Sequence, residues 1–171
     1  LLGDVAGLTL LASESGQILY ENHDLGRLVK AVAFSPDGRD LAAGTSGQGG
    51  LIVIGPGGLR RVASDIMRRV GWHGSDPIGV PMDPWIVHVS GATSERIPGG
   101  KSHFVEAWFR DDGRCAALVD AVGGLWRLTS DPVRLTLAAT APGASSVAIA
   151  DDCDTLFVVA SEGVQRITTA Q

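Results

Sequence analysis

The sequence predicts an all-β fold in which a unit of four short antiparallel strands repeats along the chain. Three observations lead to this prediction. Apolar residues spaced two apart are followed by an aspartate-rich turn and a short apolar run, and this pattern recurs. A glycine opens a further apolar run in each copy. The copies lie about 40 residues apart, or about twice that where one copy is degenerate.

The first two strands of the unit are clearest in three copies. Their first strands align on Val32, Ala107 and Val147, which lie 75 and 40 residues apart. Each first strand is followed by Asp-Gly or Asp-Cys and then by an apolar run. Alternation with a period of two is typical of strands, and glycine adopts the positive φ that a tight hairpin turn requires. The pattern therefore predicts β-hairpins.

A third and a fourth strand complete the unit. Glycine precedes the predicted third strands, which cover residues 51–54, 125–128 and 164–167. More polar fourth strands are predicted at 59–62 and 133–137. Four short antiparallel strands per unit form the blade of a β-propeller, so the sequence predicts that fold.

Further copies are expected between and before the clear ones. Val70 and Trp72 align with the first strand of the unit, and residues 85–89 form its third strand. Three prolines between positions 77 and 84 each lack a ladder donor, so residues 78–82 are predicted to be an irregular or edge segment. Third and fourth strands are also predicted at 7–11 and 17–20.

The whole chain is predicted to be one propeller segment with about four blades' worth of strands. The predicted units are a partial blade at 1–22, blades at about 28–63, 66–98 and 103–138, and a partial blade at 145–168. A closed four-bladed ring is one possibility. An arc belonging to a larger propeller is favoured, because an open arc leaves strand edges and apolar faces to be covered by other sequence. Isolated residues 1–171 are therefore not expected to be stably monomeric.

One segment carries a family resemblance. Residues 28–44 read LVKAVAFSPDGRDLAAG and closely resemble the first two strands of a WD-repeat, and residues 22–24 stand where that family keeps its Gly-His pair. The Trp-Asp pair that closes the family's third strand is absent, because Ile54-Gly55, Leu128-Thr129 and Ile167-Thr168 stand near those places. The chain is WD-like, and the family's buried polar network is not expected. The resemblance implies a rigid, non-catalytic platform, which in bacteria often belongs to a longer signalling or defence protein.

Composition narrows the partners and the compartment. The formal net charge is −5 and the arginines are scattered, so a nucleic-acid partner is not expected. The apolar runs are too short for a membrane span. The two cysteines lack CxxC spacing, which favours a reducing compartment and a cytoplasmic location. Only two of the 14 basic residues are lysines, which suggests a GC-rich bacterial gene, and the chain opens without Met or a signal peptide, as a piece of a longer polypeptide would.

The motifs that could carry chemistry are incomplete. Residues 98–102 end like a phosphate-binding loop, but Glu95 stands where that loop needs glycine. Ser145 lies in no nucleophile elbow. Three evenly spaced histidines raise a metal-site hypothesis with Asp76 or Asp83, although even spacing does not bring side chains together; they are His73, His88 and His103.

The recurring aspartates have a structural explanation. They fall at the same point of each unit, where an aspartate side chain bonds its own backbone in a turn, and weak calcium binding is the alternative. These aspartates are Asp37, Asp111, Asp112, Asp151, Asp152 and Asp154. We therefore predict no catalytic, cofactor-binding or metal-binding residue.

A protein-interaction or sensor module is the function that the sequence favours. Trp85, Trp108 and Trp126 form the possible interaction surface, because aromatic anchors dominate interfaces. Trp72 is expected in the core. The partner would be another protein or the remaining part of the same propeller. The main alternative is a propeller that belongs to an enzyme, such as a peptidase-gating or metal-dependent lactonase-like propeller, which should bring acidic or histidine side chains to the axis. A ligand- or sugar-binding propeller is a third possibility.

Overall fold

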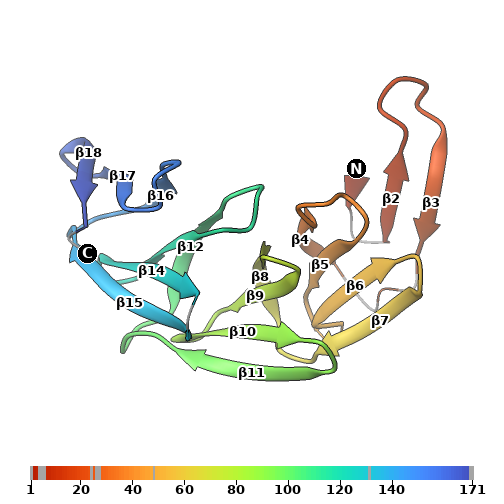
Figure 1. Cartoon of the computed structure of the whole chain (residues 1–171), viewed down its shortest axis with the longest axis horizontal. Helices are drawn as coiled ribbons and strands as arrows, with labels where there is room; N and C mark the ends of the chain where they lie inside the picture. Colours follow the sequence, from red (N-terminus) through yellow and green to blue (C-terminus); the bar gives the residue numbers. More distant parts are fainter. Residues whose placement is uncertain are drawn as a thin grey trace.

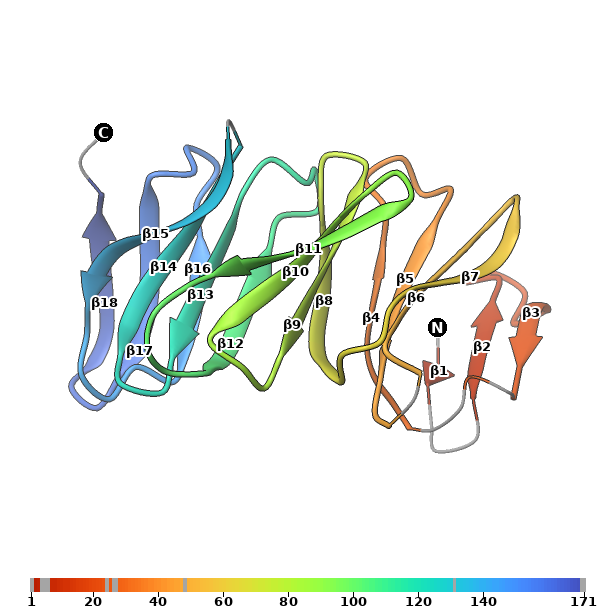
Figure 2. The same cartoon turned by 90° about the horizontal axis from the view of Figure 1, so that it is seen from below.

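Five antiparallel sheets follow one another around an open arc (Figure 1). The computed structural model describes residues 7–23, 25, 28–47, 49–130 and 132–169, and the backbone of residues 2–3. Strands run side by side across the thickness of the arc (Figure 2). The sheet nearest the N-terminus and the sheet nearest the C-terminus lie at opposite ends of the arc (Figure 1). The described strands therefore do not form a closed ring.

Three of the sheets have four strands each, in sequence order. The second sheet contains β4 (Val29–Phe34), β5 (Leu41–Thr45), β6 (Leu51–Gly55) and β7 (Gly58–Ala63). The third sheet contains β8 (Met67–His73), β9 (Asp76–Pro81), β10 (Trp85–Ser90) and β11 (Thr93–Pro98). The fourth sheet contains β12 (Phe104–Phe109), β13 (Ala116–Asp120), β14 (Gly124–Ser130) and β15 (Val133–Thr140). These sheets confirm the predicted four-stranded unit.

The sheets at the two ends of the arc have three described strands each. The first sheet contains β1 (Leu2–Gly3), β2 (Leu8–Leu11) and β3 (Ile18–Asn22). The fifth sheet contains β16 (Ser146–Ile149), β17 (Thr155–Ala160) and β18 (Gly163–Thr168). By position in the unit, the first sheet holds a second, third and fourth strand, and the fifth sheet holds a first, second and third strand.

The prediction of an irregular or edge segment at 78–82 was wrong. β9 is paired along both edges, with β8 on one side and β10 on the other. Pro77 and Pro81 stand at the two ends of β9, and only Ile78 and Gly79 pair with β10. The prolines therefore lie outside the two residues that pair with strands on both sides. The strand tolerates them because no hydrogen bond to β10 depends on the backbone N–H that proline lacks.

The turns after β4, β12 and β16 are each built on one aspartate. Oδ1 of Asp37, Asp112 and Asp152 accepts the backbone N–H two residues later, at 3.1, 3.0 and 2.9 Å. The next position has positive φ, and it is Gly38 or Gly113 in two units but Cys153, with φ of 59°, in the last. The turn hypothesis is confirmed for these three aspartates.

The core lies between neighbouring sheets, because each sheet packs an apolar face against the next. Between the second and third sheets, Ala42, Leu51 and Val53 meet the buried face of β8 and β10. The fourth and fifth sheets bury a similar set, in which Val119 and Leu125 meet Leu156 and Val158. Burying a side chain of this kind stabilises the fold by roughly 1.5–3 kcal/mol.

One position of β8 and of β12 packs against the sheet before it. We name β4, β8, β12 and β16 the inner strands. Trp72 donates its indole N–H to the carbonyl of Ala33, at 3.0 Å, and is 3% exposed, as expected for a core residue. The ring of Phe109 lies over Gly71, where a Cβ would come within 2.1 Å of Cγ of that ring. The equivalent ring, Phe34, is 47% exposed, since the described strands of the first sheet include no inner strand.

A buried carboxylate orders the fourth sheet. Asp120 is 3% exposed, and its Oδ1 accepts the backbone N–H of Val122 at 3.0 Å and of Gly124 at 2.7 Å. Its Oδ2 accepts the indole N–H of Trp126 at 2.9 Å. A local polar network therefore exists in the fourth sheet, although none was expected there.

We expect Gly71→Ala to lower the free energy of unfolding by about 1–3 kcal/mol, because the added methyl must displace the ring of Phe109 from a packed core. Gly57→Ala is the matched control, since no heavy atom lies within 4 Å of its added methyl. Urea denaturation of both variants measures the difference. Equal stability of the two variants would show that the ring does not need this close approach.

Candidate functional site

An open cleft of about 630 Å³ lies where the second, third and fourth sheets present their inner strands. Its lining comes from the ends of β4, β8 and β12 and from the turns that follow β4 and β12. Aromatic and aliphatic side chains dominate this lining, with Arg110 and Asp111 at one side. We name this surface the inner cleft.

Trp108 is the aromatic side chain most exposed in the inner cleft. It is 51% exposed and shares the cleft with Phe34 and Phe109. A smaller cleft of about 330 Å³ borders the other side of Trp108, where Ile149 of the next inner strand and Asp151 contribute. Trp108 therefore separates two hollows along the inner strands. Alternation along β12 turns Phe109 toward the third sheet and leaves Trp108 accessible.

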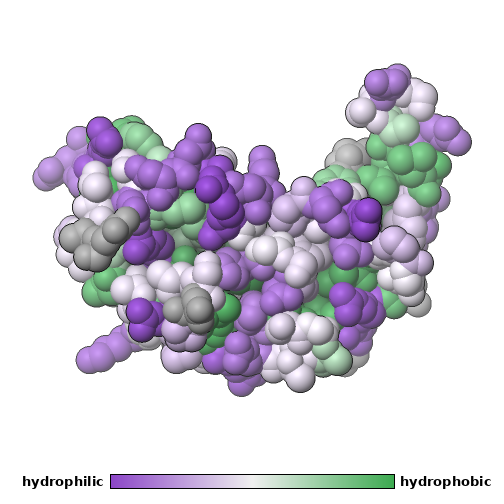
Figure 3. Space-filling model, in the orientation of Figure 1, coloured by the Kyte–Doolittle hydropathy of each residue, from purple (hydrophilic) through white to green (hydrophobic). Residues whose placement is uncertain are grey.

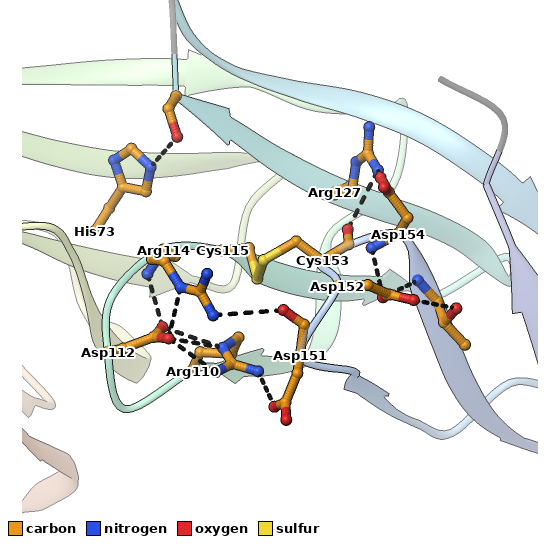
Figure 4. Close-up of a disulfide and its surroundings, with 12 residues drawn as sticks. His73, Arg110, Asp112, Arg114, Cys115, Arg127, Asp151, Asp152, Cys153 and Asp154 are labelled. Carbon is orange, nitrogen blue, oxygen red and sulfur yellow. Dashed lines mark hydrogen bonds and ion pairs between the residues drawn. A yellow bond between two sulfur atoms is a disulfide. The ribbon is translucent and has the colours of Figure 1, made fainter.

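Charged side chains border these clefts at the turn after β12. Arg110 donates to both oxygens of Asp112 and also pairs with Asp151 in the turn after β16 (Figure 4). Arg114 donates to Oδ2 of Asp112 at 2.7 Å and to the carbonyl of Asp151 at 3.4 Å. The two arginines and two aspartates hold the two neighbouring turns together.

The hydrogen bonds in these turns shift the pKa values of the charged side chains. The pKa of Asp112 lies well below its ordinary value, chiefly because Arg110 donates to it, and also because the backbone and side chain of Arg114 donate to it. The pKa of Arg110 is raised, first by Asp112 and then by Asp151. The pKa of Asp152 is lowered by the backbone N–H groups of Thr155 and Asp154 and by the hydroxyl of Thr155.

A disulfide between Cys115 and Cys153 joins the same two turns (Figure 4). The Cα atoms lie 5.9 Å apart, which is typical of such bonds. Cysteine count had favoured a reducing compartment, and the pairing weighs against that expectation. Sequence reasoning missed the bond because the repeat places Cys115 at the end of one turn and Cys153 inside another. Only the packing of the fourth sheet on the fifth brings the two together.

The three tryptophans of the predicted surface do not share one face. Trp108 lies on an inner strand, whereas Trp85 and Trp126 lie on third strands. The guanidinium of Arg96 covers Trp85, 5.0 Å from its ring centre. Trp126 packs edge-on against Phe104 and donates to Asp120.

Two of the three histidines come together. The ring centres of His73 and His88 lie 6.4 Å apart, and His103 precedes β12, in another sheet. His88 bonds Oε1 of Glu95 at 3.1 Å, and Oδ2 of Asp76 lies 3.2 Å from its other ring nitrogen without the alignment of a hydrogen bond. Across the described residues, no three such side chains are placed to hold a metal ion.

Burial lowers the pKa of His73. The nearby His88 adds to this effect, and Asp76 opposes it. Nε2 of His73 lies 3.0 Å from the hydroxyl of Ser130, so the ring bonds across to the fourth sheet. The pair of His73 and Ser130 therefore belongs to the contact between the third and fourth sheets.

The remaining motif candidates lie in ordinary connections. Residues 99–103 join β11 to β12, and the phosphate-loop setting of a strand followed by a helix is not formed there. Gly99 and Gly100 approach the rings of Phe104 and Trp126. Ser145 donates to the carbonyl of Val159 beside the start of β16. In the described part of the chain, no helix long and apolar enough to cross a membrane is found.

Comparison with known proteins identifies the fold. No family model matches the sequence, and no curated protein matches it. The structure matches the β-propeller domain of Cps50 (Swd1) from Myceliophteria thermophila with a TM-score of 0.67 and 14% sequence identity. The match covers 92% of this chain and 57% of that one, so the chain spans little more than half of the solved propeller. The all-β fold of four-stranded propeller blades that the WD-like repeat predicted is thereby confirmed.

We expect the double variant Cys115→Ser, Cys153→Ser to lose about 4 kcal/mol of unfolding free energy, as a bond that closes a loop of this length stabilises by restricting the unfolded chain. Urea denaturation without reductant measures the loss. Reductant should destabilise the wild type by the same amount and leave the variant unchanged. Two free thiols in the native, unreduced protein would contradict the bond.

Acid should destabilise the protein through its turn aspartates. The pKa of Asp112 is lowered in the fold, so its stabilising effect is complete above the unfolded value of about 3.9 and is lost as the pH falls toward the folded value. Unfolding free energy measured from pH 5 to pH 2 should therefore fall. Asp112→Asn should flatten this fall, and an unchanged slope would show that the network does not stabilise the fold.

Proposed function

We propose that this chain is a non-catalytic β-propeller module that binds a partner protein at the inner cleft, with Trp108 as the central anchor. The observation that carries the proposal is a half-exposed tryptophan between two hollows on the inner strands. Tryptophan is enriched among the few residues that dominate interface energy. The cleft is also large enough for a peptide segment with one or two bulky side chains.

The chemistry of the cleft supports recognition over catalysis. An enzyme-associated propeller should bring several carboxylates or histidines to the inner strands. Among its described lining residues the inner cleft has a single carboxylate, Asp111, and mostly apolar side chains. Since one fold hosts many functions, this composition supports the proposal more directly than the fold does.

The setting of the module is part of the proposal. A longer bacterial signalling or defence protein fits the WD-like repeat, and a protein partner fits the net charge of −5 better than nucleic acid or an anionic membrane does. The cytoplasmic location stays a prediction. The bond between Cys115 and Cys153 weighs against it, because disulfides persist mainly in oxidising compartments.

We expect Trp108→Ala to weaken binding of selected peptides by about 30-fold, the loss typical of a central interface anchor. The peptides come from a displayed random library selected on the immobilised wild-type chain, and their affinity is measured by fluorescence anisotropy. Leu137→Ala is the control, since Leu137 is 49% exposed but lies on the outer strand β15. Peptides that bind Trp108→Ala and wild type equally would place recognition elsewhere.

A further inference from the structure

The last sheet of the arc exposes an apolar face. Phe157 and Val159 alternate with buried residues along β17 and are 43% and 45% exposed. Val164, which pairs with Val159 across the ladder, is 73% exposed. Ala148 and Arg166 flank Phe157 on the two neighbouring strands. Apolar atoms are visible at this end of the arc in Figure 3. We name these five residues the end face.

The positions of Phe157 and Val164 are buried in the two earlier units that the repeat aligns best. The turn aspartates fix the alignment, so Phe157 corresponds to Ala42 and Ala117, and both alanines are 0% exposed. Val164 follows the glycine that opens the third strand, as Leu51 and Leu125 do, and these leucines are also 0% exposed. The end face is therefore a blade surface of the kind that another sheet normally covers.

What covers these positions in the earlier units is the next inner strand and its hairpin. Ala42 and Leu51 pack with Val70 and Trp72 of β8. Ala117, Val119 and Leu125 pack with Val147 and Ile149 of β16, and with the strand that follows the turn. We call the contact between two neighbouring sheets a seam. A large apolar side chain of the inner strand fills each of these two seams.

Arg166 of the end face has a counterpart, Arg127, that bonds to the neighbouring sheet. Arg127 holds the position of Arg166 in the preceding sheet. It donates to the carbonyl of Cys153 at 3.2 Å and to Oγ1 of Thr169 at 2.9 Å, and it also pairs with Asp154. The next hairpin thus supplies oxygen acceptors to this arginine. Arg166 is exposed on a face with no sheet beyond it among the described residues.

We propose that the end face docks a further blade of the same polypeptide, whose inner strand places a large apolar side chain over Ala148 and whose hairpin turn offers a carbonyl and an aspartate to Arg166. This inference rests on the proposed propeller module. It is continuous with the seams that already join the described sheets. The match to only 57% of a solved propeller is consistent with such an addition.

A thiol-accessibility experiment tests the proposal on a matched pair of valines. Val164→Cys lies on the end face and Val122→Cys lies in the turn after β13, and the native side chains are 73% and 74% exposed. The native cysteines do not react, because they are paired. Each variant is treated with a maleimide, without reductant, as residues 1–171 and as the complete polypeptide that the gene encodes.

Residues 1–171 are labelled at a dilution at which light scattering finds monomers, and there the two thiols should react at similar rates. In the complete polypeptide the thiol at 164 should react at least roughly tenfold more slowly than the thiol at 122, because a covered residue reacts only after local opening. Phe157→Cys provides a second position on the end face, and an unchanged melting temperature verifies that each variant is folded.

Equal rates at 164 and 122 in the complete polypeptide overturn the proposal. If the thiol at 164 is protected only after host extract is added, a separate chain covers the end face, and this result also overturns the proposal. The outcome is independent of peptide binding at Trp108, because the inner cleft and the end face share no residue. Failure at one surface therefore leaves the other unaffected.

Discussion

The packing of each sheet on the one before it is the constraint on which the whole structure depends. A single sheet of this kind has two apolar faces and cannot bury either alone. The seams are filled by a side chain from each inner strand, as Trp72 does over Ala33 and Phe109 does over Gly71. Polar groups then fix the register. Arg69 and Glu106 form a two-bonded ion pair at 2.7 and 2.9 Å between the inner strands of the third and fourth sheets.

Local pattern was enough to predict the strands, since period-two alternation and turn chemistry are properties of neighbouring residues. Val32, Ala107 and Val147 do occupy equivalent places, and the turn aspartates at 37, 112 and 152 bond as expected. β9 escaped prediction because proline counts against a strand that is paired on both edges, unless its place in the ladder is known.

The candidate site was less predictable, because it depends on which sheet faces which. Three tryptophans looked equivalent in sequence, yet only Trp108 faces the inner cleft. Trp126 instead meets Asp120, six residues earlier, across a turn that no standard spacing marks. Cys115 and Cys153 are 38 residues apart, and their pairing follows from the seam alone. Contacts between neighbouring sheets join residues that are far apart in the sequence, so a local pattern does not predict them.

The disulfide also decides how the chain would carry a mechanical load. Tension applied between the two ends would pass directly from Cys115 to Cys153 through the sulfur atoms. β13, β14, β15 and β16 lie inside the loop that this bond closes, so they would be shielded from the pull. The strands before β13 have no such bypass, because the chain has only two cysteines. β17 and β18 lie beyond Cys153 and have no bypass either, so a stretched molecule would yield in the strands on both sides of the loop before β13 to β16 carried any load.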